Sequence, residues 1–70
     1  MANTYTAITK KVGKWWVGWI EEVPGVNCQE RTREKLLESL QVTLKEMIAF
    51  NRKDAIRAAS PDYSEEPLTI

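Results

Sequence analysis

The stretch Lys14–Cys28, KWWVGWIEEVPGVNC, decides the fold, because it joins a tryptophan-rich segment to a turn and a further extended segment. Aromatic and β-branched residues such as Trp15, Val17 and Ile20 favour extended backbone. Pro24-Gly25 then combines a fixed backbone angle with an unusually free one, which is typical of a turn. The stretch therefore predicts a strand over residues 15–22, a turn at Pro24-Gly25 and a short strand over residues 26–30.

A first strand is predicted over residues 4–12, where polar and apolar residues roughly alternate. Gly13-Lys14 suits a two-residue type II′ turn, which takes glycine at its first position. Such a turn places Val12 opposite Trp15 and fixes the register of the hairpin. One face then carries Ile8, Val12, Trp15, Val17 and Trp19, and the other carries Tyr5, Ala7, Trp16, Gly18 and Ile20.

A long helix is predicted over residues 33–50. Thr32 can cap its first turn through the side-chain hydroxyl, and Glu34 places negative charge where the helix dipole favours it. At about 100° per residue, the apolar side chains of this segment form one continuous stripe. The stripe consists of Leu36, Leu37, Leu40, Leu44, Met47, Ile48 and Phe50.

The stripe loses phase after Asn51, because an unbroken helix would bring Asp54 into the apolar sector and turn Ile56 outwards. Asn51 can cap a new helix, so we expect a break there and a short helix over residues 52–59. A final strand is expected over residues 64–70, at a sheet edge because of Pro67. This tail either joins its own sheet, pairs with a neighbouring subunit, or frays.

These elements predict an α+β fold, in which the long helix covers one face of a small antiparallel sheet in the order β-β-β-α-short α-β. We expect the helix on the more apolar face, which carries Trp15 and Trp19. The opposite face would stay exposed, and its apolar side chains predict an interface. Its residues are Tyr5, Ala7, Trp16, Gly18 and Ile20, and we expect a homo-oligomer (dimer or tetramer) or a partner complex built on them. Alternatively, Trp16 is a lone exposed aromatic or lies under the tail.

Composition excludes several classes of protein. The chain has 70 residues, enough for one domain, and its ten acidic and ten basic residues cancel. Without histidine it lacks the usual general base and the commonest metal ligand, so we expect no enzyme, no catalytic or metal site and no cofactor. The single cysteine, Cys28, favours a reduced, cytoplasmic setting, and the sequence has neither a membrane-spanning apolar run nor a signal peptide.

Three lysines crowd the predicted hairpin tip beside the tryptophans. Basic and aromatic residues together can bind single-stranded nucleic acid, so Lys10, Lys11 and Lys14 are candidate contacts. Lysines on strand edges more often prevent aggregation, and the chain carries no net charge. We therefore expect no nucleic-acid partner.

Residues Tyr5–Phe50, about two-thirds of the chain, resemble the HicB-like antitoxin family. The aromatic pair Trp15-Trp16 follows the hairpin turn, and Glu22-Val23-Pro24-Gly25 with Gln29 is similar to the family's acidic-x-Pro-Gly-x-x-x-Gln strand end. Thr32 then opens a helix with Glu34 and a leucine stripe. Arg31 departs from the family, which usually has glycine before the capping threonine.

The resemblance implies a β-β-β-α-β domain, described as a reduced ribonuclease-H-like fold, and a non-catalytic antitoxin. Such antitoxins bind and silence HicA, a small toxin that cleaves messenger RNA with a histidine, and they tend to form dimers or tetramers. Typical members also carry a C-terminal DNA-binding domain, which has no counterpart in residues 1–70, so we expect no operator binding. The alternatives are a small nucleic-acid-binding regulator and a solitary HicB-like oligomer without a toxin.

Overall fold

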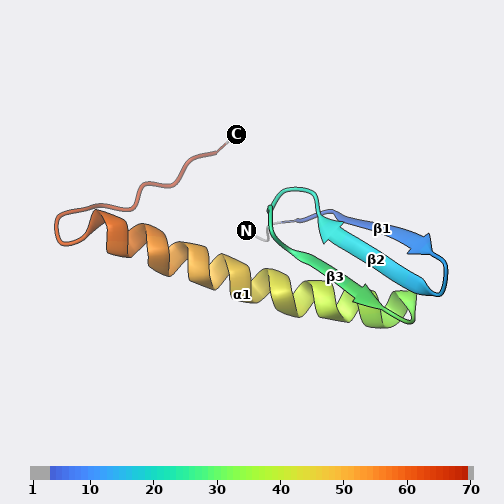
Figure 1. The fold of residues 1–70 in the computed structure, drawn as a ribbon. Coiled ribbons are helices and arrows are strands. Elements are labelled where there is room, and N and C mark those ends of the chain that lie inside the picture. The colour runs from blue at the N-terminus through green and yellow to red at the C-terminus, as the bar shows by residue number, and fades with distance from the viewer. Residues whose placement is uncertain (1–3, 70) are drawn as a thin grey trace.

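A three-stranded antiparallel sheet packs on the first half of one long helix (Figure 1) in the computed structural model, which describes residues 4–69. The strands are β1 (Ala7–Val12), β2 (Trp15–Ile20) and β3 (Asn27–Glu30), and the helix is α1 (Arg33–Ala59). β2 lies between β1 and β3. The predicted α+β class is confirmed, although all three strands are shorter than the expected ranges 4–12, 15–22 and 26–30.

The hairpin has the predicted register. Val12 pairs with Trp15, and the ladder continues to Ala7 opposite Ile20. Gly13 has a φ of 61°, whereas every described non-glycine residue, Lys14 included, has a negative φ. A positive φ at the first loop position alone matches the expected type II′ turn. Gly25, with a φ of 90°, supplies the second turn, between β2 and β3.

The helix begins where Thr32 caps it. The Thr32 Oγ1 accepts a hydrogen bond from the Lys35 backbone N–H at 3.1 Å, and the Thr32 carbonyl accepts from Leu36 at 3.0 Å. Thr32 itself is extended, with a φ of −127°, as a capping residue must be. The predicted start of the helix is thus confirmed.

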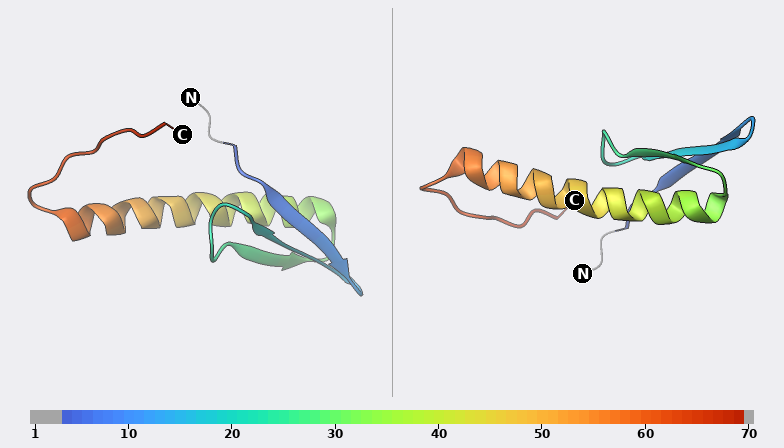
Figure 2. Two further views of the ribbon diagram at one scale, coloured as in Figure 1. Left: turned by 90° about the horizontal axis from the view of Figure 1, so that it is seen from above. Right: turned by 60° about the horizontal axis from the view of Figure 1, so that its bottom comes forward.

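The predicted break at Asn51 is wrong, because α1 runs unbroken through 27 residues. At about 1.5 Å per residue such a helix is about 40 Å long, and the sheet covers only its first half (Figures 1 and 2). Asp54 therefore lies beyond the sheet and is exposed to water. Ile56, on another side of the helix, is half-buried and lines a hollow together with Tyr63 of the tail.

The predicted strand over residues 64–70 is also wrong. Residues 64–69 form no strand, and Ile70 lies outside the described residues. The tail instead turns back beside the distal half of α1 (Figure 2), where Arg52 and Glu65 form an exposed ion pair at 3.2 Å. The sheet thus has three strands among the described residues, and Tyr63, Ser64 and Glu65 of the tail line a hollow beside α1.

The core lies between the sheet and α1, so the prediction that the helix covers the face of Trp15 and Trp19 is wrong. Its buried side chains are Ile20, Val26, Leu36, Leu40 and Leu44, with Trp16 packed against them. Gly18 explains this choice, because a β carbon there would lie 3.1 Å from both Leu36 Cδ2 and Leu40 Cδ1. The missing side chain lets α1 approach closely, whereas Trp15 and Trp19 would hold it away from the other face.

Candidate interaction surface

The face of the sheet turned away from α1 is the candidate site, and we name it the outer face. The register arranges it in three rows across the strands. Ile8, Trp19 and Asn27 form the first row, Lys10, Val17 and Gln29 the second, and Val12 and Trp15 the third. The apolar side chains therefore belong to β1 and β2, and β3 contributes amides.

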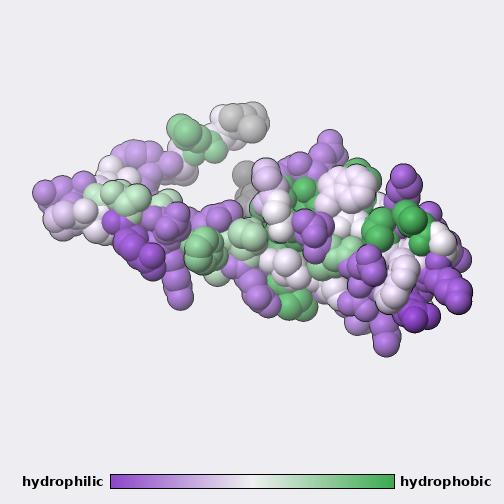
Figure 3. Space-filling model, viewed as in Figure 1, coloured by the Kyte–Doolittle hydropathy of each residue, from purple (hydrophilic) through white to green (hydrophobic). Residues whose placement is uncertain are grey.

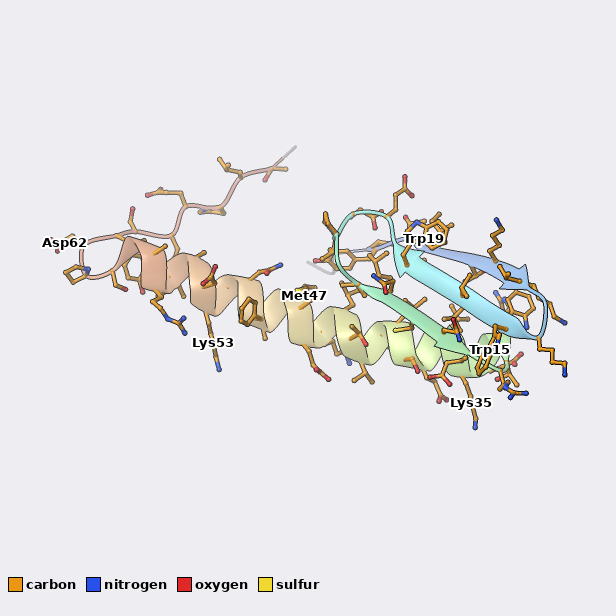
Figure 4. All side chains as sticks on the ribbon, viewed as in Figure 1. Trp15, Trp19, Lys35, Met47, Lys53 and Asp62 are labelled. Carbon is orange, nitrogen blue, oxygen red and sulfur yellow. The ribbon has the colours of Figure 1, made fainter. Side chains whose placement is uncertain are left out.

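This face exposes large apolar side chains to solvent. Val12 is 51% exposed, Trp15 37% and Trp19 44%. Ile8 and Val17 between them are half-buried. Trp15 and Trp19 extend from the same side of β2 (Figure 4), and hydrophobic and near-neutral side chains gather over the sheet, bordered by hydrophilic ones (Figure 3). A contiguous patch of this kind is typical of a binding surface.

The hairpin end of the outer face is basic. Lys14 lies in the turn, and the Arg31 guanidinium carbon lies 4.5 Å from the centroid of the Trp15 ring. A cation over an indole face is attracted by the ring electrons, so Arg31 also orients Trp15. Arg31 thus places a charged side chain on the candidate site.

The opposite end is acidic. The Glu21 backbone N–H donates to the Thr6 carbonyl at 2.9 Å, so strand pairing extends past Ile20 and alternation places Glu21 on the side of Trp19. Glu22 accepts a hydrogen bond from the Thr6 backbone N–H at 2.7 Å through its Oε1. This hydrogen bond lowers the pKa of the Glu22 carboxyl below its ordinary value.

The predicted interface residues lie on the helix side of the sheet, so the interface expected on them is wrong. Ile20 and Gly18 are buried, and Tyr5 and Trp16 are half-buried against the core. Ala7 is exposed at the start of β1. The argument that one helix can shelter only one face still holds, but the exposed face is that of Trp15 and Trp19. Glycine between Trp16 and Ile20 was the signal that identifies the packed face.

The three candidate lysines do not form one site. Lys10 pairs with Val17 on the outer face, and Lys14 lies in the turn. Lys11 extends from the other face, where its Nζ lies 5.9 Å from the centroid of the Trp16 ring. The structure therefore separates Lys11 from Trp15 and Trp19.

The polar contacts of β3 attach it to the helix. The Ser39 hydroxyl donates to Glu30 Oε2 at 2.7 Å, and Cys28 Sγ lies 3.5 Å from Thr43 Oγ1.

Within residues 4–69, no group of His, Cys, Asp or Glu side chains could hold a metal ion. In the same part of the chain, α1 is too polar to cross a membrane.

A second apolar surface lies on α1 beside β3 and the β2–β3 turn. Thr43, Glu46, Met47 and Phe50 line a shallow hollow of about 470 Å³. Met47 reaches the β2–β3 turn, since its Cε would lie 3.6 Å from a β carbon on Gly25. Phe50, which is exposed, forms the outer end of the hollow.

Comparison with known proteins finds no match for the chain, so the candidate site is described from its geometry alone. No protein-family model matches the chain. No curated protein and no solved structure is similar enough to count as a match.

Proposed function

We propose that the chain is a non-catalytic protein-interaction module that binds its partner through the outer face. The observation that carries this proposal is the pair Trp15 and Trp19, exposed on one side of β2 beside Val12. A tryptophan can bury roughly 150–250 Å² in a contact, and tryptophan is enriched among the residues that contribute most of the binding energy of interfaces. Burying this pair in a complex removes the largest apolar surface of the sheet from water.

The proposed partner is a small toxin of the HicA type, which the resemblance over Tyr5–Phe50 suggests. In this mechanism the antitoxin acts sterically, because its sheet covers the surface with which the toxin holds or cleaves messenger RNA. The strand, strand, strand, helix order is compatible with the HicB-like fold that we propose. Residues 64–69 do not supply that fold's last strand, so a partner or a second copy would have to complete the sheet.

The proposed setting is the cytoplasm, where such a toxin would meet its messenger RNA. The unpaired thiol of Cys28 supports this placement, because reducing compartments keep thiols free.

The experiment is co-expression with a HicA-type toxin, taken from a reading frame next to the gene where one of that size is present. Wild-type protein should restore growth and co-purify with the toxin. Trp19→Glu should fail in both respects, since a buried carboxylate without a partner is costly in an interface. Val42→Glu is the matched control, because Val42 is 57% exposed on α1, away from the outer face. Equal rescue by all three proteins would contradict the proposal.

A second candidate function is binding of single-stranded RNA, and the observation that favours it is the basic end of the outer face. Lys14 and Arg31 lie beside Trp15, so charge and base stacking could act together. Such binding weakens steeply with salt, because phosphate contacts release counterions. Retention of a labelled oligonucleotide at low salt, lost in Lys14→Glu, would favour this function over the first.

A further inference from the structure

β3 is the last strand of the sheet, and one of its edges is open. The Ile20 backbone N–H donates to the Val26 carbonyl at 3.1 Å, and hydrogen-bonded pairs recur at every second residue of an antiparallel ladder. The backbone groups of Asn27 and Gln29 therefore point away from β2, to a side where no strand of the described residues lies. An open row of N–H and C=O groups is a template for a further strand.

The two edges of the sheet differ in charge. β1 carries Lys10 and Lys11, and lysines on an edge strand hinder the addition of another strand. β3 has the sequence NCQE, which contains no lysine. Asn27 and Gln29 are exposed amides without charge. The edge of β3 is therefore the more open of the two to an added strand.

The hollow on α1 lies beside this edge. Thr43 lines the hollow, and its Oγ1 lies 3.5 Å from Cys28 Sγ, so the hollow begins beneath β3. Met47 lies on α1 where the turn before β3 approaches the helix (Figure 4), within reach of Gly25. Phe50 forms the outer end and is 62% exposed. Alternate residues of a strand added to β3 face the helix, so one row of its side chains lies over the hollow.

We propose that the open edge of β3 and the hollow on α1 together bind an extended segment of a partner protein, which adds to the sheet as a fourth strand. The segment runs antiparallel to β3, since antiparallel pairing is the more stable. A large apolar side chain opposite Val26 enters the hollow between Met47 and Phe50. The residue two positions before it also faces α1. A lysine or arginine there reaches Glu46, the one charged residue among the described residues that line the hollow.

The chain's own tail does not suit this site. It carries Glu65 and Glu66, whose carboxylates would be repelled by Glu46. Pro67 also lacks the N–H that a strand donates. The tail lies on the other side of α1 (Figure 2), where Glu65 pairs with Arg52 at 3.2 Å. The acidic hollow therefore favours a basic and apolar segment from a different protein.

Fluorescence anisotropy of the dye-labelled hexapeptide TTKTLT with the purified full chain tests the proposal. A segment this short should bind with a dissociation constant of about 10–100 µM, since it contacts much less surface than a standard interface does. Methylation of the amide nitrogen of the threonine between lysine and leucine removes the N–H that donates to the Asn27 carbonyl. The methylated peptide should bind at least about tenfold more weakly.

Variants of the chain test each part of the site. Phe50→Ala should raise the dissociation constant about five- to tenfold, because it removes one wall of the hollow. Ile48→Ala is the matched control, since Ile48 is 37% exposed on the same helix and is not among the described residues that line the hollow. Glu46→Lys should weaken binding of TTKTLT and strengthen binding of TTETLT, because the exchanged charges attract. Asn27→Pro removes only an outward N–H and should weaken both peptides.

The outcomes separate this inference from the proposed function. Equal binding of the methylated peptide, an unchanged constant in Phe50→Ala, or no binding of TTKTLT up to about 1 mM overturns the site. Tighter binding of a peptide of residues 61–69 overturns the basic partner and assigns the site to the tail of a second copy. Where Asn27→Pro fails to fold by circular dichroism, the methylated peptide decides. Trp19→Glu should bind TTKTLT as wild type does, so its failure to bind the toxin leaves this inference standing.

Discussion

Gly18 of β2 lies directly beneath Leu40 of α1, and a β carbon on Gly18 would lie 3.1 Å from Leu40 Cδ1. The same atom would lie 2.8 Å from the Ile8 carbonyl oxygen, which belongs to the backbone of β1. The helix and the sheet therefore meet at a point that only glycine leaves open. This contact sets which face of the sheet is covered and, in consequence, which face exposes its tryptophans.

Gly18→Val should destabilise the fold by about 1–3 kcal/mol, because overpacking forces the helix or β1 to shift. Urea unfolding followed by circular dichroism measures the loss. Lys10→Val is the matched control, since Lys10 is an exposed position of β1 on the face turned away from the helix. A Gly18→Val variant as stable as the control would show that the helix does not approach β2 this closely.

Local chemistry made much of the fold predictable. The turn at Gly13 fixed the pairing of Val12 with Trp15, and the capping residue Thr32 marked the start of the helix. Each of these depends on neighbours within a few residues, so the sequence pattern carries enough information. The sequence pattern does not show which face of the hairpin the helix covers, because both faces are apolar. Counting apolar side chains favoured Trp15 and Trp19, whereas the helix needs the close approach at Gly18.

The break expected at Asn51 failed for a related reason. When the apolar stripe of a helix loses its phase, a break is expected only if the sheet still packs against that part of the helix. The sheet ends near Met47, so Asp54 on the same helix is simply solvated. The tail then covers part of the far side, including Ile56. Both facts depend on the length of the sheet relative to α1, which no local pattern of residues contains.

The cap of α1 should contribute measurably to stability. Thr32→Ala removes the acceptor for the Lys35 N–H, and we expect a loss of about 1 kcal/mol in the free energy of unfolding. Thr32→Ser keeps the hydroxyl and should lose little. Urea unfolding of the three proteins measures both effects. Equal losses for alanine and serine would indicate that the threonine methyl group, rather than the cap, matters.

Glu22 should make the stability depend on pH. Its pKa is lowered in the folded chain by the hydrogen bond from the Thr6 N–H, so folding favours the ionised carboxylate. The stabilisation is fully present above the ordinary pKa of glutamate and is lost as the pH falls through the lower, folded-state pKa. The difference in free energy of unfolding between wild type and Glu22→Gln should therefore shrink towards acid pH.

Urea unfolding at a series of pH values measures this difference. Glu38→Gln, which alters an exposed carboxylate on α1, controls for the change in overall charge. A wild-type advantage over Glu22→Gln that stays constant from neutral to acid pH would rule out the hydrogen bond as its source.

Leu40 and Phe50 belong to the same predicted stripe, yet they should respond very differently to truncation. Leu40 is 1% exposed and packs in the core, so Leu40→Ala should cost about 2–5 kcal/mol. Phe50 is 62% exposed beyond the sheet, and Phe50→Ala should change the stability by less than about 0.5 kcal/mol. Urea unfolding followed by circular dichroism measures both variants. A loss for Phe50→Ala as large as that for Leu40→Ala would show that the Phe50 side chain is packed against the rest of the chain rather than exposed.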